Sequence, residues 1–340
     1  MRRLPGVVIV AFACAIAGAG LQAVADFPSW AYGVTMPPPP PGAAPAAPAP
    51  AAGGGRAAGA APAADATLHS LPGATQQFTR AQIANQYGPA DWYPGDHPQM
   101  PEIVAKGKQT QNVAACSLCH MPNGKGRPEN APLAGLPAGY FVQQLVDFKE
   151  GLRTSADPRK ANTKTMIEAA ADMTDAEMKE AAAYFASMTW TPWITVRESA
   201  TVPRTRLTGN VFFPLPGDTE PIGDRIIEAP EDVERFELRD PHSGFVAYVP
   251  PGSLRQGALL VTTGGGKTIS CGVCHGLDLK GLGPVPAIAG RSPSYIMRQL
   301  WDFHQGTRHG AWSPLMTPIV EHLTQEEMLA ISAYVAAQGG

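Results

Sequence analysis

The sequence carries the pattern Cys-x-x-Cys-His twice, as Cys116-Ser-Leu-Cys119-His120 and as Cys271-Gly-Val-Cys274-His275. On a helix, residues three and four apart are neighbours, so the cysteines and the histidine of this pattern share one face. Two such thiols form thioethers to the vinyl groups of one porphyrin, and the histidine then lies under the iron as its proximal ligand. The two motifs therefore predict two covalently bound haem c groups.

Two other uses of paired cysteines fit these motifs less well. A structural zinc site needs a second pair of ligands at its own spacing. A redox disulfide does not need the histidine that follows both pairs. The fifth cysteine, Cys14, lies in the first apolar stretch, so the mature protein has no thiol left for a structural disulfide or an axial thiolate.

The chain around the two motifs is an internal repeat. The pattern Gln-Leu-x-Asp-Phe recurs at 144–148 and 299–303, and a glycine and an arginine follow it each time, the arginines being Arg153 and Arg308. Duplication explains this common spacing better than chance does. The two arginines suit haem propionates, because a guanidinium fork matches a carboxylate, although a solvated position at a helix end fits the sequence equally well.

Apolar residues at helical spacing predict corresponding helices in both copies. The predicted ranges are 140–150 and 175–187 in the first copy, 295–305 and 324–337 in the second, and, with less regular patterns before the motifs, 100–108 and 253–263. The last helix of each copy follows a capping box, in which Thr174 and Thr324 are the N-caps and a glutamate stands three residues on.

The sixth iron ligand decides whether such a haem carries electrons or does chemistry. A distal methionine closes the iron and raises its potential, whereas an open position admits peroxide or other small ligands. The repeat pairs Met166 with Met316, and we expect each to bind iron from a loop that crosses the haem. Pro318 suits such a loop, because it favours an extended chain at the preceding residue. The rival ligands are three histidines of the second copy without counterparts in the first: His304, His309 and His322.

The N-terminal region has the pattern of an export signal. Arg2 and Arg3 precede an apolar stretch from Val7 to Leu21, and Ala23-Val24-Ala25 matches the small-residue cleavage pattern. We expect a signal peptide over 1–25 and a periplasmic protein, with an uncleaved membrane anchor as the alternative.

The rest of the chain divides by composition. A tract dominated by Pro, Ala and Gly predicts a disordered arm, since it cannot bury enough apolar surface to fold. Apolar runs separated by turn residues predict an irregular segment of short strands between the copies. The expected boundaries are 26–77 for the arm, 78–189 for the first haem domain, 190–251 for the interdomain segment and 252–340 for the second haem domain. The net charge of −3 provides no basic field for nucleic acid.

With these motifs in place, the chain resembles the two-domain di-haem class I cytochromes c over about 102–189 and 252–338. The resemblance implies an all-α fold of two tandem domains, in which the first and last helices cross and haem fills the core. It also implies that the carbonyl of Pro286 accepts the ring N–H of the proximal histidine, which orients the imidazole. In the first copy the corresponding proline, Pro132, stands one residue later.

The resemblance implies a periplasmic electron carrier with no substrate chemistry of its own. It would take single electrons from a dehydrogenase or a quinol-oxidising complex and pass them to a terminal oxidase or reductase. The alternative is a permanently bound cytochrome subunit of a periplasmic dehydrogenase or oxidase complex, and a di-haem peroxidase-type enzyme is the third hypothesis. The expected partners are redox proteins, with a membrane only if the N-terminal segment stays uncleaved.

Overall fold

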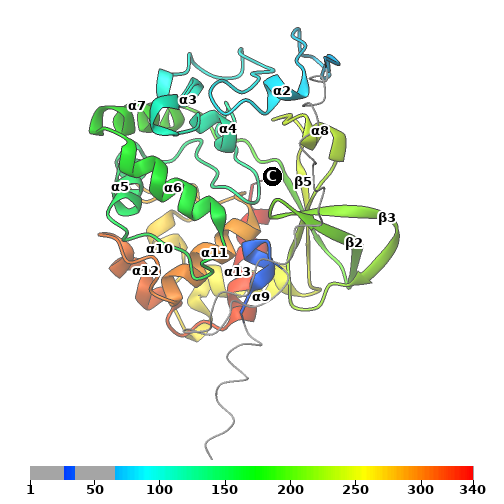
Figure 1. Cartoon of the computed structure of the whole chain (residues 1–340). Helices are drawn as coiled ribbons and strands as arrows, with labels where there is room; N and C mark the ends of the chain where they lie inside the picture. Colours follow the sequence, from blue (N-terminus) through cyan, green and yellow to red (C-terminus); the bar gives the residue numbers. More distant parts are fainter. Residues whose placement is uncertain (1–26, 35–65, 340) are drawn as a thin grey trace, which may run out of the picture.

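The computed structural model describes residues 27–34 and 66–339 of the chain. Figure 1 shows a first helical unit (cyan to green) stacked on a second (yellow to red), with a group of strands beside both. The expected signal peptide and residues 35–65 of the expected arm lie outside the described residues. In the part of the chain that is described, no helix has the length and apolarity needed to cross a membrane.

The two units contain corresponding α-helices in the same order. Those of the first unit are α3 (Glu102–Ala105), α4 (Cys116–His120), α5 (Ala138–Lys149), α6 (Ala161–Asp172) and α7 (Asp175–Ala186). Those of the second are α9 (Ser253–Thr263), α10 (Gly272–His275), α11 (Pro293–His304), α12 (Ser313–Val320) and α13 (Gln325–Ala337). The repeat in the sequence is therefore a repeat in the structure.

Most of the predicted helices are confirmed. The capping boxes are complete, because Thr174 and Thr324 accept backbone N–H groups from Glu177 and Glu327, whose carboxylates bind the threonine N–H groups in return. The helix before the second motif spans the predicted residues, whereas the one before the first motif is a single turn, α3.

The expectation that Met166 and Met316 lie in loops is wrong. Met166 lies within α6 and Met316 within α12. The sequence of α6 is rich in alanine, the strongest helix former, and its 12 residues form about three helical turns. In α12, Pro318 lies inside the helix and costs it one backbone hydrogen bond, a loss that this short helix tolerates.

The segment between the units is built of strands, so the fold is mixed and not all-α. Its elements are β1 (Ile194–Glu198), β2 (Thr201–Thr208), β3 (Val211–Pro221), β4 (Ile227–Pro230), the short helix α8 (Val233–Glu237) and β5 (Phe245–Val249). One sheet has the order β1-β5-β4, with β1 parallel and β4 antiparallel to β5. The strands β2 and β3 form a separate antiparallel hairpin that extends away from the helices (Figure 1). The apolar runs that predicted short strands thus build an ordered β module.

Residues 27–34, expected to belong to a disordered arm, pack onto the second unit. Their 3-10 helix η1 (Ser29–Tyr32) lies in one core cluster with residues of α9, α11 and α13. The Tyr32 hydroxyl is buried and donates to Asp302 Oδ1 at 2.7 Å, and Arg298 Nη1 donates to the Ala31 carbonyl at 2.6 Å. The prediction failed here because Trp30 and Tyr32 bury large aromatic surfaces that the Pro/Ala composition around them conceals.

Residues 66–77, also expected to belong to the disordered arm, are ordered, and with residues 78–98 and α8 they cover one end of the first unit. Their core consists of four buried apolar residues: Leu71, Ile83, Trp92 and Leu238. The Trp92 indole donates to the Leu238 carbonyl at 2.8 Å. The helix α2 (Arg80–Ile83) of this covering segment lies next to α8 in Figure 1.

Candidate haem-binding sites

The first motif lines a large cavity of the first unit. The helix α4 contributes Cys116, Cys119 and His120 to its wall, and α6 contributes Met166. The cavity holds about 1320 Å³ of space not filled by protein atoms, part of it open to solvent. Its wall is mainly apolar with a few polar groups, which is the usual character of a cofactor site. Its wall also includes side chains of α11, so the second unit helps to close the first site.

Each motif histidine is oriented by a backbone carbonyl. His120 Nδ1 lies 2.8 Å from the Ala131 carbonyl, and His275 Nδ1 lies 2.8 Å from the Pro286 carbonyl. A carbonyl only accepts, so Nδ1 carries the proton and Nε2 keeps a lone pair for a metal. The contact to Pro286 was predicted; in the first unit Ala131, at the corresponding position, takes that place although it is not a proline.

Burial keeps both imidazoles neutral. It lowers the pKa of His120 and of His275, and the carbonyl hydrogen bonds oppose this only in part. Both side chains are less than a tenth exposed. A neutral, oriented imidazole is the form that binds iron.

The first cysteine of each motif lacks the character of a reactive redox thiol. Burial raises the pKa of Cys116 to about 12 and that of Cys271 to about 11. A reactive dithiol instead has at least one thiol with a lowered pKa. Within the described ranges, no group of three or more His, Cys, Asp or Glu side chains is arranged to hold a metal ion. Two thiols, one imidazole and an apolar cavity fit a covalently bound haem.

The second motif stands in a more open setting. Cys271 and Met316 both pack against the core cluster that contains residues of α9, α11 and α13. Cys274 is exposed, in contrast to Cys119 of the first motif, which is partly buried. Leu277, two residues after the motif histidine, is 97% exposed.

A reciprocal hydrogen-bond network joins the two units. Arg153 Nη2 donates across the interface to the Tyr295 hydroxyl at 3.1 Å and to Gln299 Oε1 at 2.7 Å. Arg308 Nη2 makes the corresponding bonds to the Tyr140 hydroxyl and to Gln144 Oε1, both at 2.8 Å. Both arginines are buried, so the solvated position that the sequence left open for them is wrong. Sequence reasoning did not foresee this network, although every member of it recurs in the repeat.

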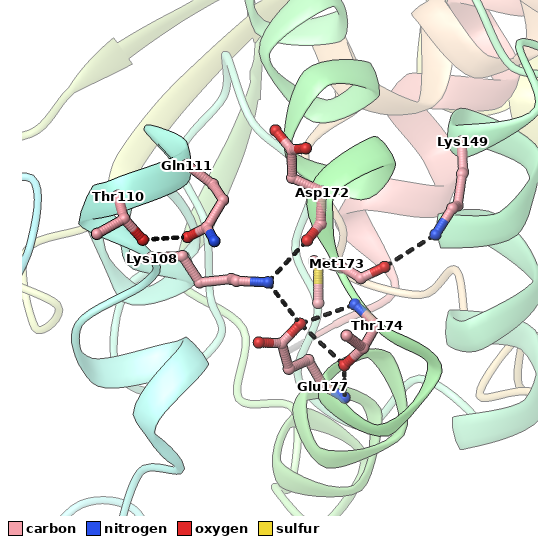
Figure 2. A network of polar contacts seen from close by, with 8 residues as sticks. All are labelled: Lys108, Thr110, Gln111, Lys149, Asp172, Met173, Thr174 and Glu177. Atoms are coloured by element: carbon pink, nitrogen blue, oxygen red, sulfur yellow. Dashed lines mark hydrogen bonds and ion pairs between the residues drawn. The ribbon is translucent and has the colours of Figure 1, made fainter.

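A second network fixes the end of α6 (Figure 2). Lys108 Nζ donates to the Asp172 carbonyl at 2.8 Å and to Glu177 Oε2 at 3.2 Å, and Lys149 Nζ donates to the Met173 carbonyl at 2.9 Å. Desolvation raises the pKa of Glu177, but the bonds from Thr174 and Lys108 outweigh it and hold the pKa below its usual value.

In the second unit the corresponding pair is Lys267 Nζ and Glu327 Oε1, at 2.6 Å. The sequence signal for both pairs was a lysine shortly before each motif and a glutamate in each capping box. In the first unit the network ties the helix that carries Met166 to the segment that leads into the motif.

Comparison with known proteins agrees with these features. The family model described as Cytochrome c matches residues 104–189. Cytochrome c-554(548) of Halomonas halodenitrificans is 36% identical over 73 residues, which are 21% of this chain and 88% of that protein. The thiosulfate dehydrogenase electron acceptor of Stutzerimonas stutzeri is 27% identical over 242 residues, 70% of this chain and 85% of that protein.

Among solved structures, cytochrome c4 from Pseudomonas stutzeri is similar, with a TM-score of 0.42 and 20% identity over 67% of this chain and 96% of that one. The first unit thus matches the family model and most of the length of a relative at 36% identity. The chain belongs to the cytochrome c family, and its paired motifs place it with the two-domain di-haem members.

Proposed function

We propose that the protein is a periplasmic electron carrier that holds one haem c in each helical unit and transfers single electrons between redox proteins. The observation that carries the proposal is the first cavity, where both motif thiols, a neutral oriented imidazole and a methionine line one space. Bound haem supplies the one-electron chemistry, and the protein supplies ligands, orientation and exclusion of water.

The proposed ligand sets follow the repeat. His120 and Met166 are the axial ligands of the first site, and His275 and Met316 those of the second. The thiols of Cys116, Cys119, Cys271 and Cys274 form the covalent links. Placing the methionines on helices supports this assignment, because a ligand on a helix is held more rigidly than one on a loop.

The same assignment argues against a peroxidase-type enzyme. Such an enzyme needs an iron position that is open to its substrate, and a methionine thioether would close that position. Export to the periplasm is supported by the signal pattern over 1–25 and by the covalent attachment of the haems.

A second candidate is a permanently bound cytochrome subunit of a periplasmic dehydrogenase. The relative from Stutzerimonas stutzeri, which aligns over 70% of this chain, is named an electron acceptor of thiosulfate dehydrogenase. The β module and the covering segment 66–98 add ordered surface beyond the two haem units, which favours a stable partner. Purification of the native protein under mild conditions separates the candidates, because a bound subunit brings a second chain with it.

Haem stoichiometry tests the main proposal. Haem released as the pyridine complex, divided by the protein concentration, should give two haems per chain, and reductive titration should take up two electrons per chain. One haem per chain would contradict the assignment of one site.

A further inference from the structure

Lys160 is a buried basic side chain in the wall of the first cavity. It stands directly before α6, lines the cavity that Met166 also lines, and is 3% exposed. Among the described residues, its Nζ has no hydrogen-bond partner. An ammonium group without a partner is costly to bury, and burial lowers the pKa of Lys160 to about 6. Such a group indicates that an anion is missing from its surroundings.

Two buried carboxylates near Lys160 are paired with arginines, although Glu129 Oε2 itself has no hydrogen-bond partner among the described residues. Glu129 Oε1 pairs with Arg127 at 2.6 Å, and Asp157 Oδ2 pairs with Arg159 at 2.7 Å. Neither carboxylate makes a hydrogen bond to Lys160. The protein therefore offers no anion of its own that is committed to this lysine.

The other cations of the cavity wall are already bound. Arg298 donates from Nη1 to the Ala31 carbonyl and from Nη2 to the Pro128 carbonyl at 2.8 Å. Arg153 donates to Gln144, Tyr295 and Gln299. In the described part of the chain, Lys160 is thus the basic side chain of this wall whose terminal nitrogen makes no hydrogen bond.

The second unit has no equivalent of Lys160. If the units are aligned on Met166 and Met316, Lys160 corresponds to Gly310, and if they are aligned on Arg153 and Arg308, it corresponds to Leu315. A side chain at Gly310 would overlap the Asp147 carboxylate, so this position has no room for a lysine. Lys160 is therefore a feature of the first site that the second site lacks.

We propose that Lys160 binds a propionate carboxylate of the haem in the first site and thereby raises the potential of that haem above that of the second. An ammonium and a carboxylate form a charge-assisted hydrogen bond, which is strong where water is excluded. The buried positive charge favours the reduced haem, because the oxidised haem carries one more positive charge. This inference rests on the proposed function, since it requires haem in the first site.

Optical redox titration of the intact di-haem protein tests the role of Lys160. In Lys160→Gln, one of the two potentials should fall, with about a tenfold change in the electron equilibrium between the haems, which is about 59 mV for one electron. Lys160→Arg should keep the wild-type potentials. Lys164→Gln is the matched control, because Lys164 lies in the first turn of α6, which begins directly after Lys160, but its side chain is 79% exposed. This variant should change neither potential.

The outcomes separate this inference from the proposed function. Two haems per chain with unchanged potentials in Lys160→Gln would overturn the propionate contact alone. A Lys160→Gln spectrum with a changed axial ligand would also overturn it, because Lys160 would then bind iron. One haem per chain in the wild type would overturn the proposed function. If Lys160→Gln does not fold with both haems bound, Lys160→Arg provides the test. This variant should bind both haems and keep the wild-type potentials, and a failure to do so would contradict the inference.

Discussion

The two haem units share a helical scaffold but differ in what surrounds it. After the first motif, Met121 is 2% exposed and Pro122 is buried. At the corresponding place after the second motif, Leu277 is 97% exposed. The covered first site and the open second site arise from one duplicated sequence, so the difference comes from segments outside the repeat.

Those segments are the covering segment 66–98 and the β module between the units, including α8. Arg127, seven residues after the first motif histidine, lies with its guanidinium 4.2 Å from the ring centre of Phe236, and Lys125 lies 5.4 Å from that of Trp193. No such cover is seen over the second motif among the described residues, where large apolar side chains are exposed instead: Leu259, Ile269, Val273, Leu277, Leu282 and Leu315. The second motif is therefore less shielded by the rest of the chain than the first.

The largest expected effect is the loss of one haem. Replacing Cys271 and Cys274 by alanine should leave one covalently bound haem per chain, because no thiol remains at the second site. Haem staining after denaturing electrophoresis, normalised to protein, measures this. The matching change at Cys116 and Cys119 should give the same count, and two haems in either variant would break the assignment of one haem to each motif.

Removing a distal methionine should open one iron. Met166→Ala and Met316→Ala should each bind carbon monoxide at one haem, because the sixth position loses its ligand. Flash photolysis should show faster rebinding in Met316→Ala, since the second site is the more open one. Equal rebinding rates would contradict the contrast between the sites, and an unchanged six-coordinate spectrum would contradict the ligand assignment.

The buried carboxylate of Glu228 should make the stability of the fold depend on pH, at the contact between the β module and the second unit. Its carboxylate accepts from Ser292 Oγ at 2.8 Å, and burial raises its pKa from 4.5 to about 7. Between pH 4.5 and pH 7 the folded state holds a proton that the unfolded state releases. The contribution of Glu228 to the free energy of unfolding is therefore fully present below pH 4.5 and is lost as the pH rises to 7. The loss is about 3 kcal/mol in unfolding free energy.

Urea unfolding at pH 5 and pH 8 measures this loss. Glu228→Gln should remove most of it, because the amide stays neutral at both values. Glu231→Gln is the control, since Glu231 follows the same strand but is exposed. A wild type and a Glu228→Gln variant with the same pH dependence would rule out Glu228 as its source.

The smallest expected effect is a difference in unfolding free energy between variants of Lys108 and Lys267, the lysines that precede the two motifs. Lys108→Met should lower the unfolding free energy by about 1 kcal/mol, because Lys108 binds both Glu177 and the Asp172 carbonyl in a partly buried setting (Figure 2). Lys267→Met should cost less, since that side chain is 47% exposed and binds Glu327 alone. The opposite order in urea unfolding would show that the end of α6 is held by other contacts.

What could be predicted from the sequence was local or repeated. The motif residues and the capping boxes at Thr174 and Thr324 depend on short spacings, and the contact between His275 and Pro286 followed from the family resemblance. The helices that carry Met166 and Met316 were missed because a ligand was assumed to require a loop. The bond between Arg153 and Tyr295, the packing of Tyr32 and the isolation of Lys160 depend on segments far apart in the chain, which spacing does not reveal.

The most direct test of the account is a carbon monoxide difference spectrum of the reduced wild-type protein. The account predicts no change, because the proposed ligands Met166 and Met316 would close both irons and leave the protein to carry electrons. A carbon monoxide complex at either haem in the unmodified protein would contradict it, since that iron would be open to substrate.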